Sequence, residues 1–232
     1  RNIIAAINRG LIGIGDNSII QGNFFGVGAD GVTAFQSGSA VSGAAETISI
    51  TGANAMIGGA SSELGNSIEN NQSSPGLILA GTVNGKVLGN RIVGNNKGIA
   101  VLDNSSGLEI GDGTAAGRNI ISGNDVLSDF ATPAYGSGIE ITNASGPIKI
   151  QGNYIGVAED GASILPNGAD GVSISDSTDV LIGGTQAGEA NIIANNQQNG
   201  VTIVGNSANI TTLSNAIYGN TQLGIDLLAD PF

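Results

Sequence analysis

Short apolar stretches recur along the chain in a fixed order, separated by Gly and Asn. One kind alternates apolar and small residues, as in GIEI, GVSI and GVTI, and another, such as IKIQG and VLIGG, precedes an Asn. The third kind follows that Asn and places a large apolar residue two positions after it, at Ile4, Phe25, Ile68, Ile92, Ile121, Ile155, Ile193 and Ile217. Alternation over four or five residues predicts short half-buried β-strands. Each repeating unit therefore holds three strands with Gly and Asn at its corners.

The minimal unit of 21 to 24 residues is too short to bury its own apolar side, so neighbouring units must stack. Three strands that each pair with their copy in the next unit form a parallel β-helix, and connections between parallel strands are almost always right-handed. A β-sandwich would need longer strands joined by hairpin turns. The sequence thus predicts an all-β fold, a single right-handed parallel β-helix (solenoid) with three short strands per turn and about eight turns.

An Asn occupies the same corner of every unit. Amide side chains stacked at one corner can hydrogen-bond to each other and to backbone groups that the corner leaves unpaired. Asn also tolerates the left-handed backbone of turns, but its recurrence in a fixed register favours a stacked ladder. The predicted structural ladder comprises Asn2, Asn23, Asn66, Asn90, Asn119, Asn153, Asn191 and Asn215. Several units carry a second Asn at the far end of the following strand, at Asn70, Asn95, Asn124, Asn195 and Asn220.

Longer connections interrupt the repeat at two corners. One set precedes the Asn strand and the other follows it. In solenoids such insertions gather on particular faces and often line the binding surface. The preceding set comprises residues 58–65, 111–118 and 183–190, and the following set comprises residues 27–46, 125–137 and 157–170.

Two stretches of the chain are nearly identical: QGNFFGVGADG, which begins at Gln21, and QGNYIGVAEDG, which begins at Gln151. We interpret them as the same corner in two different turns. No change in composition marks a linker, so we expect one domain over residues 1–232. The chain starts at Arg1 and stops abruptly at Phe232, which suggests a segment of a longer polypeptide.

The stretch QGNYIGVAEDGASILPNGADGVSISDSTDVLIGGTQAGEANIIANN resembles the right-handed parallel β-helix repeats of the pectin-lyase-like superfamily. It is most similar to repeats of large secreted or surface proteins of bacteria and some archaea, and the resemblance covers nearly the whole chain. It implies a fold and an extracellular or cell-surface location. It does not decide the activity, because the superfamily includes polysaccharide lyases, hydrolases and epimerases as well as adhesins and non-enzymatic rods.

Composition excludes several classes of function. The net charge is −12 with only 7 scattered Lys and Arg residues, which argues against nucleic-acid binding. The chain has no apolar run long enough to span a membrane. It contains no His, so a Ser-His-Asp triad cannot form.

Enzymes of the superfamily act in a groove on one exterior sheet. We expect the corresponding outward column in the GIEI-like strands to comprise Gly13, Ser49, Ile78, Ala100, Glu140, Ser173, Thr202 and Asp226. This column offers no basic side chain and no two carboxylates on adjacent turns. A lyase or epimerase would have to use Arg91, Lys149, Glu109 or Glu140. The more ordinary interpretation is that Glu109 and Lys149 form an exposed ion pair and that Arg91 is solvated.

The matching loops GADG and AEDG contain Asp30, Glu159 and Asp160, whose oxygens could bind Ca²⁺. They lack the residue spacing of known Ca²⁺ motifs, so we interpret them as acidic turn residues and predict no cofactor and no metal site.

Aromatic residues in the long loops, Phe35, Phe130 and Tyr135, could form either a shallow carbohydrate or protein contact or an apolar cap, and Tyr154 and Tyr218 are expected on strands. Sequons at Asn71, Asn104, Asn143 and Asn209 are expected by chance in a chain this rich in Asn and Ser, and Asn71 could point inward.

The mild exterior and the lack of obvious caps at the ends predict a non-enzymatic structural or adhesive rod of an extracellular or cell-surface protein. Its expected partners are neighbouring domains or copies of itself stacked end to end as a filament, and surface carbohydrate. The alternative is a carbohydrate-active enzyme of the polysaccharide lyase or epimerase type. A third hypothesis, an ice-binding face on the flat column, is disfavoured because that column holds a single Thr, Thr202.

Overall fold

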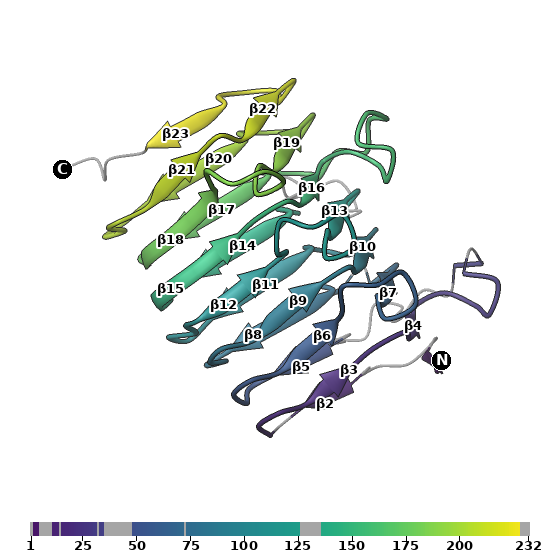
Figure 1. Cartoon of the computed structure of the whole chain (residues 1–232). Coiled ribbons are helices and arrows are strands. Elements are labelled where there is room, and N and C mark those ends of the chain that lie inside the picture. The colour runs from purple at the N-terminus through teal and green to yellow at the C-terminus, as the bar shows by residue number, and fades with distance from the viewer. Residues whose placement is uncertain are drawn as a thin grey trace.

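The computed structural model describes residues 2–4, 11–13, 15–31, 33–34, 48–71, 73–125 and 136–227. These residues form a single right-handed parallel β-helix, as the repeat predicts, and contain strands but no helix (Figure 1). The chain winds through three parallel sheets in turn, so that each strand pairs with the strand three positions further along. Because none of these residues is helical, the described chain offers no helix that could span a membrane.

Sheet A has eight strands: β1 (Ile3–Ile4), β4 (Phe24–Phe25), β7 (Ser67–Glu69), β10 (Arg91–Val93), β13 (Ile120–Ser122), β16 (Tyr154–Ile155), β19 (Ile192–Ala194) and β22 (Ala216–Tyr218). Sheet B also has eight: β2 (Leu11–Gly13), β5 (Ile48–Ile50), β8 (Leu77–Ala80), β11 (Ile99–Leu102), β14 (Ile139–Thr142), β17 (Val172–Ser175), β20 (Val201–Val204) and β23 (Ile225–Leu227). Sheet C has seven: β3 (Ile19–Ile20), β6 (Met56–Gly58), β9 (Lys86–Leu88), β12 (Leu108–Ile110), β15 (Ser145–Ile150), β18 (Thr178–Gly183) and β21 (Thr211–Leu213).

The core is a set of aliphatic columns that run along the helix axis. In sheet A, Ile92 pairs with Ile68 on one side and Ile121 on the other, and all three side chains are fully buried. Sheets B and C supply equivalent columns, and together they form one continuous apolar cluster. Burying one such Ile stabilises the fold by about 1.5–3 kcal/mol, so each added turn extends the core by several such contributions.

An Asn ladder runs between sheets C and A. Asn90 is typical: its backbone N–H and its Nδ2 both donate to Oδ1 of Asn119 one turn later, at 2.9 and 3.1 Å. Its Nδ2 also donates to the carbonyl of Ile57, at 2.9 Å. The same donation from one Asn to the next links Asn2, Asn23, Asn66, Asn90, Asn119, Asn153, Asn191 and Asn215.

A second ladder follows the sheet A strands, and here the expected membership differs from the structure. Asn70 and Asn195 are not members; they are left-handed turn residues, with φ of 60° and 61°. The residue after each of them takes the ladder position. Asn167, inside the insertion 157–170, is an unexpected member. The second ladder is Asn71, Asn95, Asn124, Asn167, Asn196 and Asn220.

The outward column of sheet B is also shifted at its first position. Ile12 pairs with Ser49, and Gly13 pairs with the buried Ile50, so Gly13 does not belong to the outward column. Gly13 must face the core, because a Cβ there would lie 2.8 Å from Cδ1 of Ile50. From Ser49 to Asp226 the strand pairing follows the expected column.

Both sets of insertions flank the same sheet. The first set joins sheet C to sheet A, and the second joins sheet A to sheet B. The remaining corner, from sheet B to sheet C, is short in every described turn and uses left-handed residues such as Asn54 and Asn84. Loops therefore rise on the two sides of sheet A, whose outer face they can enclose.

Candidate functional site: a walled groove on sheet A

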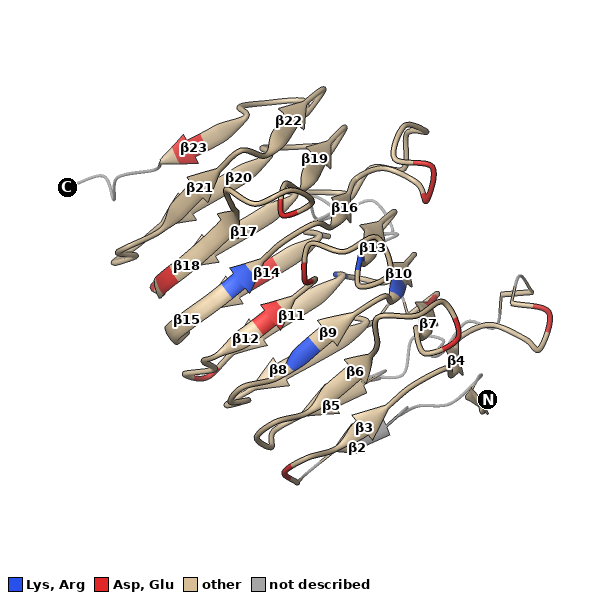
Figure 2. Ribbon diagram, viewed as in Figure 1, with Lys and Arg blue, Asp and Glu red and all other residues tan. Residues whose placement is uncertain are grey.

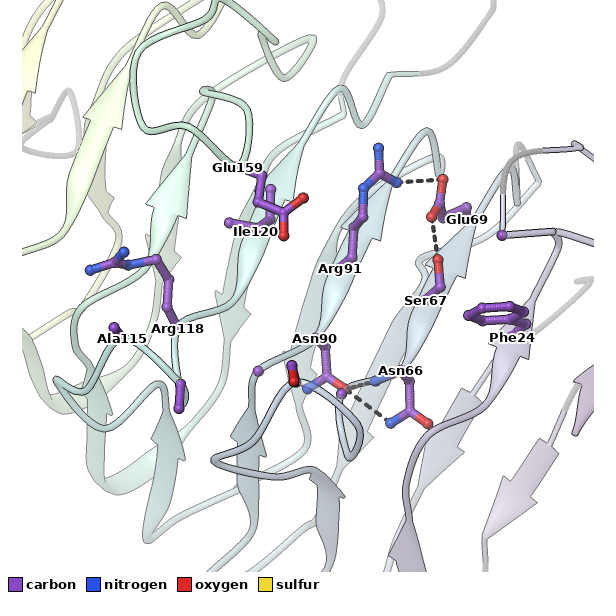
Figure 3. Close-up of a pocket in the computed structure, with 15 residues that line it drawn as sticks. Phe24, Asn66, Ser67, Glu69, Asn90, Arg91, Ala115, Arg118, Ile120 and Glu159 are labelled. Carbon is purple, nitrogen blue, oxygen red and sulfur yellow. Dashed lines mark hydrogen bonds and ion pairs between the residues drawn. The ribbon is translucent and has the colours of Figure 1, made fainter. Parts of the chain in front are cut away.

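A groove of about 680 Å³ lies on the outer face of sheet A (Figure 3). Its floor takes one side chain from each of four successive strands: Phe24, Ser67, Arg91 and Ile120. These residues are paired in register, so three interstrand steps of about 4.8 Å give the floor a length of roughly 14 Å along the axis. Tyr154 continues the same column on β16.

Two loops from the corner between sheets C and A form one side of the groove. The loop 59–65 contributes Ser62 and Gly65, and the loop 111–118 contributes Ala115 and Arg118. Gly65 is required at its position because a Cβ would lie 2.0 Å from the carbonyl oxygen of Gly89 in the next turn. The loops thus lie tightly against the helix and form a fixed wall.

Two hairpins stand on the other side of the groove, one near each end. The first hairpin, of which residues 27–31 and 33–34 are described, closes with an antiparallel bridge between Val27 and Ala34, and it brings Gly31 to the groove. The second hairpin, residues 157–164, also closes with an antiparallel bridge, and it brings Glu159 to the groove. Glu159 is exposed and lies over Ile120 in Figure 3.

The two hairpins contain the predicted acidic loop residues, whose oxygens serve the turns themselves. Asp30 accepts hydrogen bonds from the backbone N–H and the hydroxyl of Thr33, and Asp160 does the same with Ser163. The side-chain hydrogen bond from Ser163, helped by the N–H groups of Ala162 and Ser163, lowers the pKa of Asp160 to about 2. In the part of the chain that the structure describes, no three His, Cys, Asp or Glu residues are grouped to hold a metal ion.

The floor carries an ion pair between neighbouring strands. Nη1 of Arg91 lies 2.5 Å from Oε2 of Glu69, and the hydroxyl of Ser67 hydrogen-bonds to the other carboxylate oxygen. The Glu69 side chain is 11% exposed and that of Arg91 is 42% exposed. Arg91 therefore has the acidic companion that was not expected from the sequence, and its guanidinium is anchored through Nη1 while the side chain stays partly exposed.

A second arginine is held from the wall. Nε of Arg118 donates to the carbonyl of Gly152 at 3.0 Å, and its guanidinium lies 4.1 Å from the ring centroid of Tyr154. Tyr154 in turn lies under the second hairpin, because a Cβ on Gly161 would meet its ring at 2.8 Å. Strand, wall and hairpin thus fix the direction of this side chain together.

The four residues proposed for a lyase or epimerase lie on three different sheets. Arg91 is on sheet A, Glu140 is on sheet B, and Glu109 and Lys149 are on sheet C. Glu109 pairs in register with Lys149, but its ion pair is with Lys86, at 2.7 Å. Glu140 is paired with Lys97, also at 2.7 Å. Figure 2 shows these charges distributed one by one over the turns, so they do not form one site.

The outer face of sheet B is more enclosed than expected. Ser49, Ala100 and Thr202 point away from the core and are nevertheless buried. Around Thr202, Asp170 and Asn199 form a hydrogen-bonded network that spans adjacent turns. Burial there raises the pKa of Asp170.

Several other predicted residues do not enter the groove. Phe35, Phe130 and Tyr135 lie outside the described residues, and Tyr218 is half exposed on β22. Among the sequons, Asn71 is fully buried in the second ladder, while Asn104, Asn143 and Asn209 are exposed at the corner between sheets B and C.

Glu69 and Arg118 were not singled out from the sequence. The signal that could have found them is the position of the insertions: both sets flank the Asn strand, which marks the outer face of that strand as the walled one.

Comparison with known proteins gives little beyond this geometry. No family model matches the chain, and no curated protein matches it. Among solved structures, an alginate lyase from Paenibacillus sp. str. FPU-7 is similar over 97% of this chain and 91% of its own, with 12% sequence identity and a TM-score of 0.40. A likeness at this level carries no argument about activity.

Proposed function

We propose that this chain is a non-enzymatic structural or adhesive rod, part of an extracellular or cell-surface protein and akin to the non-enzymatic β-helices of the pectin-lyase-like superfamily. The observation that carries the proposal is the continuity of bonding along the axis. Three sheets and two Asn ladders extend from turn to turn, and ladder residues such as Asn90 and Asn95 donate twice to the next. Such a column resists bending, because displacing one turn breaks strand pairing and amide hydrogen bonds together.

The arrangement of exterior charges supports the same function. Glu69, Glu109 and Glu140 each hold a cation on a neighbouring strand or turn, and Asp30 and Asp160 are engaged by their own hairpins. Exposed pairs of this kind add little stability individually. They do neutralise these three carboxylates within the stack, which suits a scaffold that displays loops.

One observation favours the second candidate, a polysaccharide lyase or epimerase. The walled groove places Arg91, Arg118 and Glu159 around one cavity. A lyase needs a base to remove a proton beside a carboxylate and a cation to hold the charge that develops. The cations are present, but Lys149, Glu109 and Glu140 lie on other faces, so Glu159 would have to act as the base.

Prolonged incubation with pectate and with alginate, followed by ultraviolet absorbance of unsaturated products, separates the two functions. We expect no product above that of a heat-denatured sample. Product formation that disappears in an Arg91→Ala or Glu159→Gln variant would overturn the structural proposal. Retention of that activity in Lys149→Ala, whose side chain is exposed on sheet C, would assign it to the groove.

A further inference from the structure

Asp170 is a buried carboxylate at the corner between sheets A and B, two residues before β17, with 8% of its surface exposed. Among the described residues, no Lys or Arg forms an ion pair with it. Neutral groups hold it instead: the backbone N–H of Asn199 donates to its Oδ1 at 2.9 Å, and the hydroxyl of Thr202 hydrogen-bonds to its side chain. A buried carboxylate without a cation is costly to keep ionised, so the protonation state of Asp170 matters to its surroundings.

The hydrogen bonds continue from Asp170 into the next two turns. Nδ2 of Asn199 donates to Oγ1 of Thr202 at 3.0 Å and to Oδ2 of Asp226 on β23 at 3.2 Å. Oδ1 of Asn199 accepts the backbone N–H of Leu223 at 2.8 Å. Asn199 thus uses its whole amide group, and it ties the turn that contains β23 to a network that has a carboxylate at each end.

The Thr202 hydroxyl gives this network its direction. Its oxygen accepts from Asn199 and its hydrogen goes to Asp170, because an ionised carboxylate can only accept. A protonated Asp170 carries a donor of its own, which can point at the Thr202 oxygen. The hydroxyl hydrogen is then available to Asp226, the residue with which Thr202 pairs in register on the neighbouring strand. Uptake of one proton from solvent therefore removes one of two negative charges and reverses the hydroxyl.

Other charged side chains in this part of the described chain are few. Lys97 and Glu140 lie on the same side of the helix and are paired with each other at 2.7 Å. Asp125 belongs to an earlier turn and lies against Gly168. Asp226 is the charged group that acts electrostatically on the buried carboxylate.

Burial is the main cause that raises the pKa of Asp170, and the negative charge of Asp226 adds to it, against the hydrogen bonds from Asn199 and Thr202. The folded pKa therefore lies above the ordinary value of 3.8, and the fold favours the protonated form. The stability linked to this group is complete below pH 3.8 and is lost as the pH rises through the folded pKa.

We propose that this network is a proton-operated latch for residues 223–227, loose while Asp170 is ionised and tight once it is protonated. The latch consists of Asp170, Asn199, Thr202 and Asp226. In the loose state two like charges share one set of hydrogen bonds, and in the tight state a single carboxylate remains, on β23, with the hydroxyl to bind it. The inference goes beyond the structural role proposed above and does not depend on it, because it concerns the attachment of one turn.

Amide hydrogen exchange of the full chain measures how tightly the latch holds. The reporters are the N–H of Leu223, bonded to the Asn199 side chain, and the N–H of Val201, bonded to the carbonyl of Gly224. Protection factors correct for the pH dependence of the intrinsic exchange rate. Both should rise at least about threefold when the pH is lowered from about 7 to about 4. An NMR titration of the Asp170 carboxyl should follow the same curve, with a midpoint above 3.8.

Variants identify the groups responsible. Asp170→Asn imitates the protonated form, since its oxygen can accept from Asn199 and its amide can donate to Thr202, so protection should be high at both pH values. Thr202→Val keeps the shape but removes the hydroxyl, and should reduce the pH response. Asp226→Asn removes the second charge and should lower the pKa of Asp170. Asp103→Asn, at the exposed corner between sheets B and C, is the control and should respond as the parent does.

Three results would contradict the latch: a midpoint of Asp170 at or below 3.8, protection at Leu223 that stays constant while Asp170 titrates, or an unchanged pH response in Asp170→Asn. An equal rise in protection at the distant Lys86 N–H, bonded to Ala55, would indicate a global change in stability and would contradict it as well. If Asp170→Asn does not fold, Asp226→Asn still decides, because an unchanged midpoint of Asp170 in that variant would show that the two carboxylates are not coupled.

Discussion

The two hairpins are built alike from nearly the same eleven residues. In each copy a Gln side chain donates a hydrogen bond to a Gly carbonyl of the next turn. Nε2 of Gln21 donates to the carbonyl of Gly58, and Nε2 of Gln151 donates to the carbonyl of Gly183. The ladder Asn follows, then an aromatic ring under a left-handed Gly, and then the Asp that closes the turn. The shared residues are those that determine the shape of the hairpin.

The copies differ at two positions beside the groove. Ala29 in the first copy corresponds to Glu159 in the second, and Phe24 corresponds to Tyr154, which carries Arg118 against its ring. The first hairpin therefore gives its end of the groove an apolar character, and the second gives its end a charged one. The comparison teaches that one structural unit, used twice, can make the two ends of a groove chemically distinct.

Substitutions in the Asn ladder should give the largest difference in stability between the two copies. Asn153→Ala should lower the free energy of unfolding by about 3–4 kcal/mol, because the N–H and Nδ2 of Asn119 and the carbonyl of Ile110 lose their partner in a fully buried site. Asn23→Ala should cost only about 1–2 kcal/mol, because its donor, Asn2, is exposed and can bond to water.

Urea denaturation of both variants measures this difference. Asn206→Ala, an exposed position outside both ladders, provides the control and should stay near the parent value. Equal losses at Asn23 and Asn153 would mean that burial does not set the strength of the ladder.

The next largest difference concerns the Gly that covers each aromatic ring. Gly161→Ala should destabilise by about 2–3 kcal/mol, because it combines a φ of +70° with a Cβ only 2.8 Å from Cζ of Tyr154. Gly31→Ala has a similar φ of +68° but a contact of 3.3 Å to Phe24, and should cost about 1–2 kcal/mol.

A double-mutant cycle distinguishes steric overlap from backbone strain. In a Tyr154→Ala background the ring is gone, so Gly161→Ala should cost only about 1 kcal/mol, the penalty of the left-handed backbone. An undiminished cost in that background would show that the ring does not determine the need for Gly.

A smaller effect on stability is expected from the ionisation of Asp160 in the second hairpin. The pKa of Asp160 is lowered from 3.8 to about 2 in the fold, so the ionised form is the one that the hairpin stabilises. Its contribution should be complete above the unfolded pKa of 3.8 and should be lost as the pH falls toward about 2. An NMR titration of the Asp160 carboxyl, followed also at the Ser163 amide, measures this pKa. A midpoint near 3.8 would mean that the turn does not hold the carboxylate, and Asp160→Asn should abolish the response at Ser163.

The repeat made the fold predictable from sequence, because stacking multiplies a weak local signal over many turns. The same repetition fixed the register of Asn90 and Ile92, where each neighbouring turn restricts the assignment of the next. The predicted outward column of sheet B was wrong at Gly13. A single residue there decides which residues of the strand face the core, and Gly has no side chain that would indicate it. The prediction also missed Asn167, because an insertion hides the ladder position.

The groove was harder to predict, because its residues come from four strands and four separate loops. Glu69 and Arg91 lie 22 positions apart and meet only because their strands are neighbours. Arg118 depends on the shape of a single loop that no other turn repeats. Residues that repeat in every turn indicate the scaffold, whereas the groove is formed by residues that the other turns do not repeat.

The smallest effect on stability, and the sharpest test of the comparison, is an exchange of the residue that distinguishes the hairpins. Ala29 and Glu159 are both exposed, so Ala29→Glu and Glu159→Ala should each change the free energy of unfolding by less than about 0.5 kcal/mol. The double exchange should stay within the same limit, because the two hairpins share the residues that determine their shape and differ here only in an exposed side chain. Urea denaturation of the three variants measures these changes. A loss above about 1 kcal/mol for Glu159→Ala but not for Ala29→Glu would show that the Glu159 side chain stabilises the second hairpin.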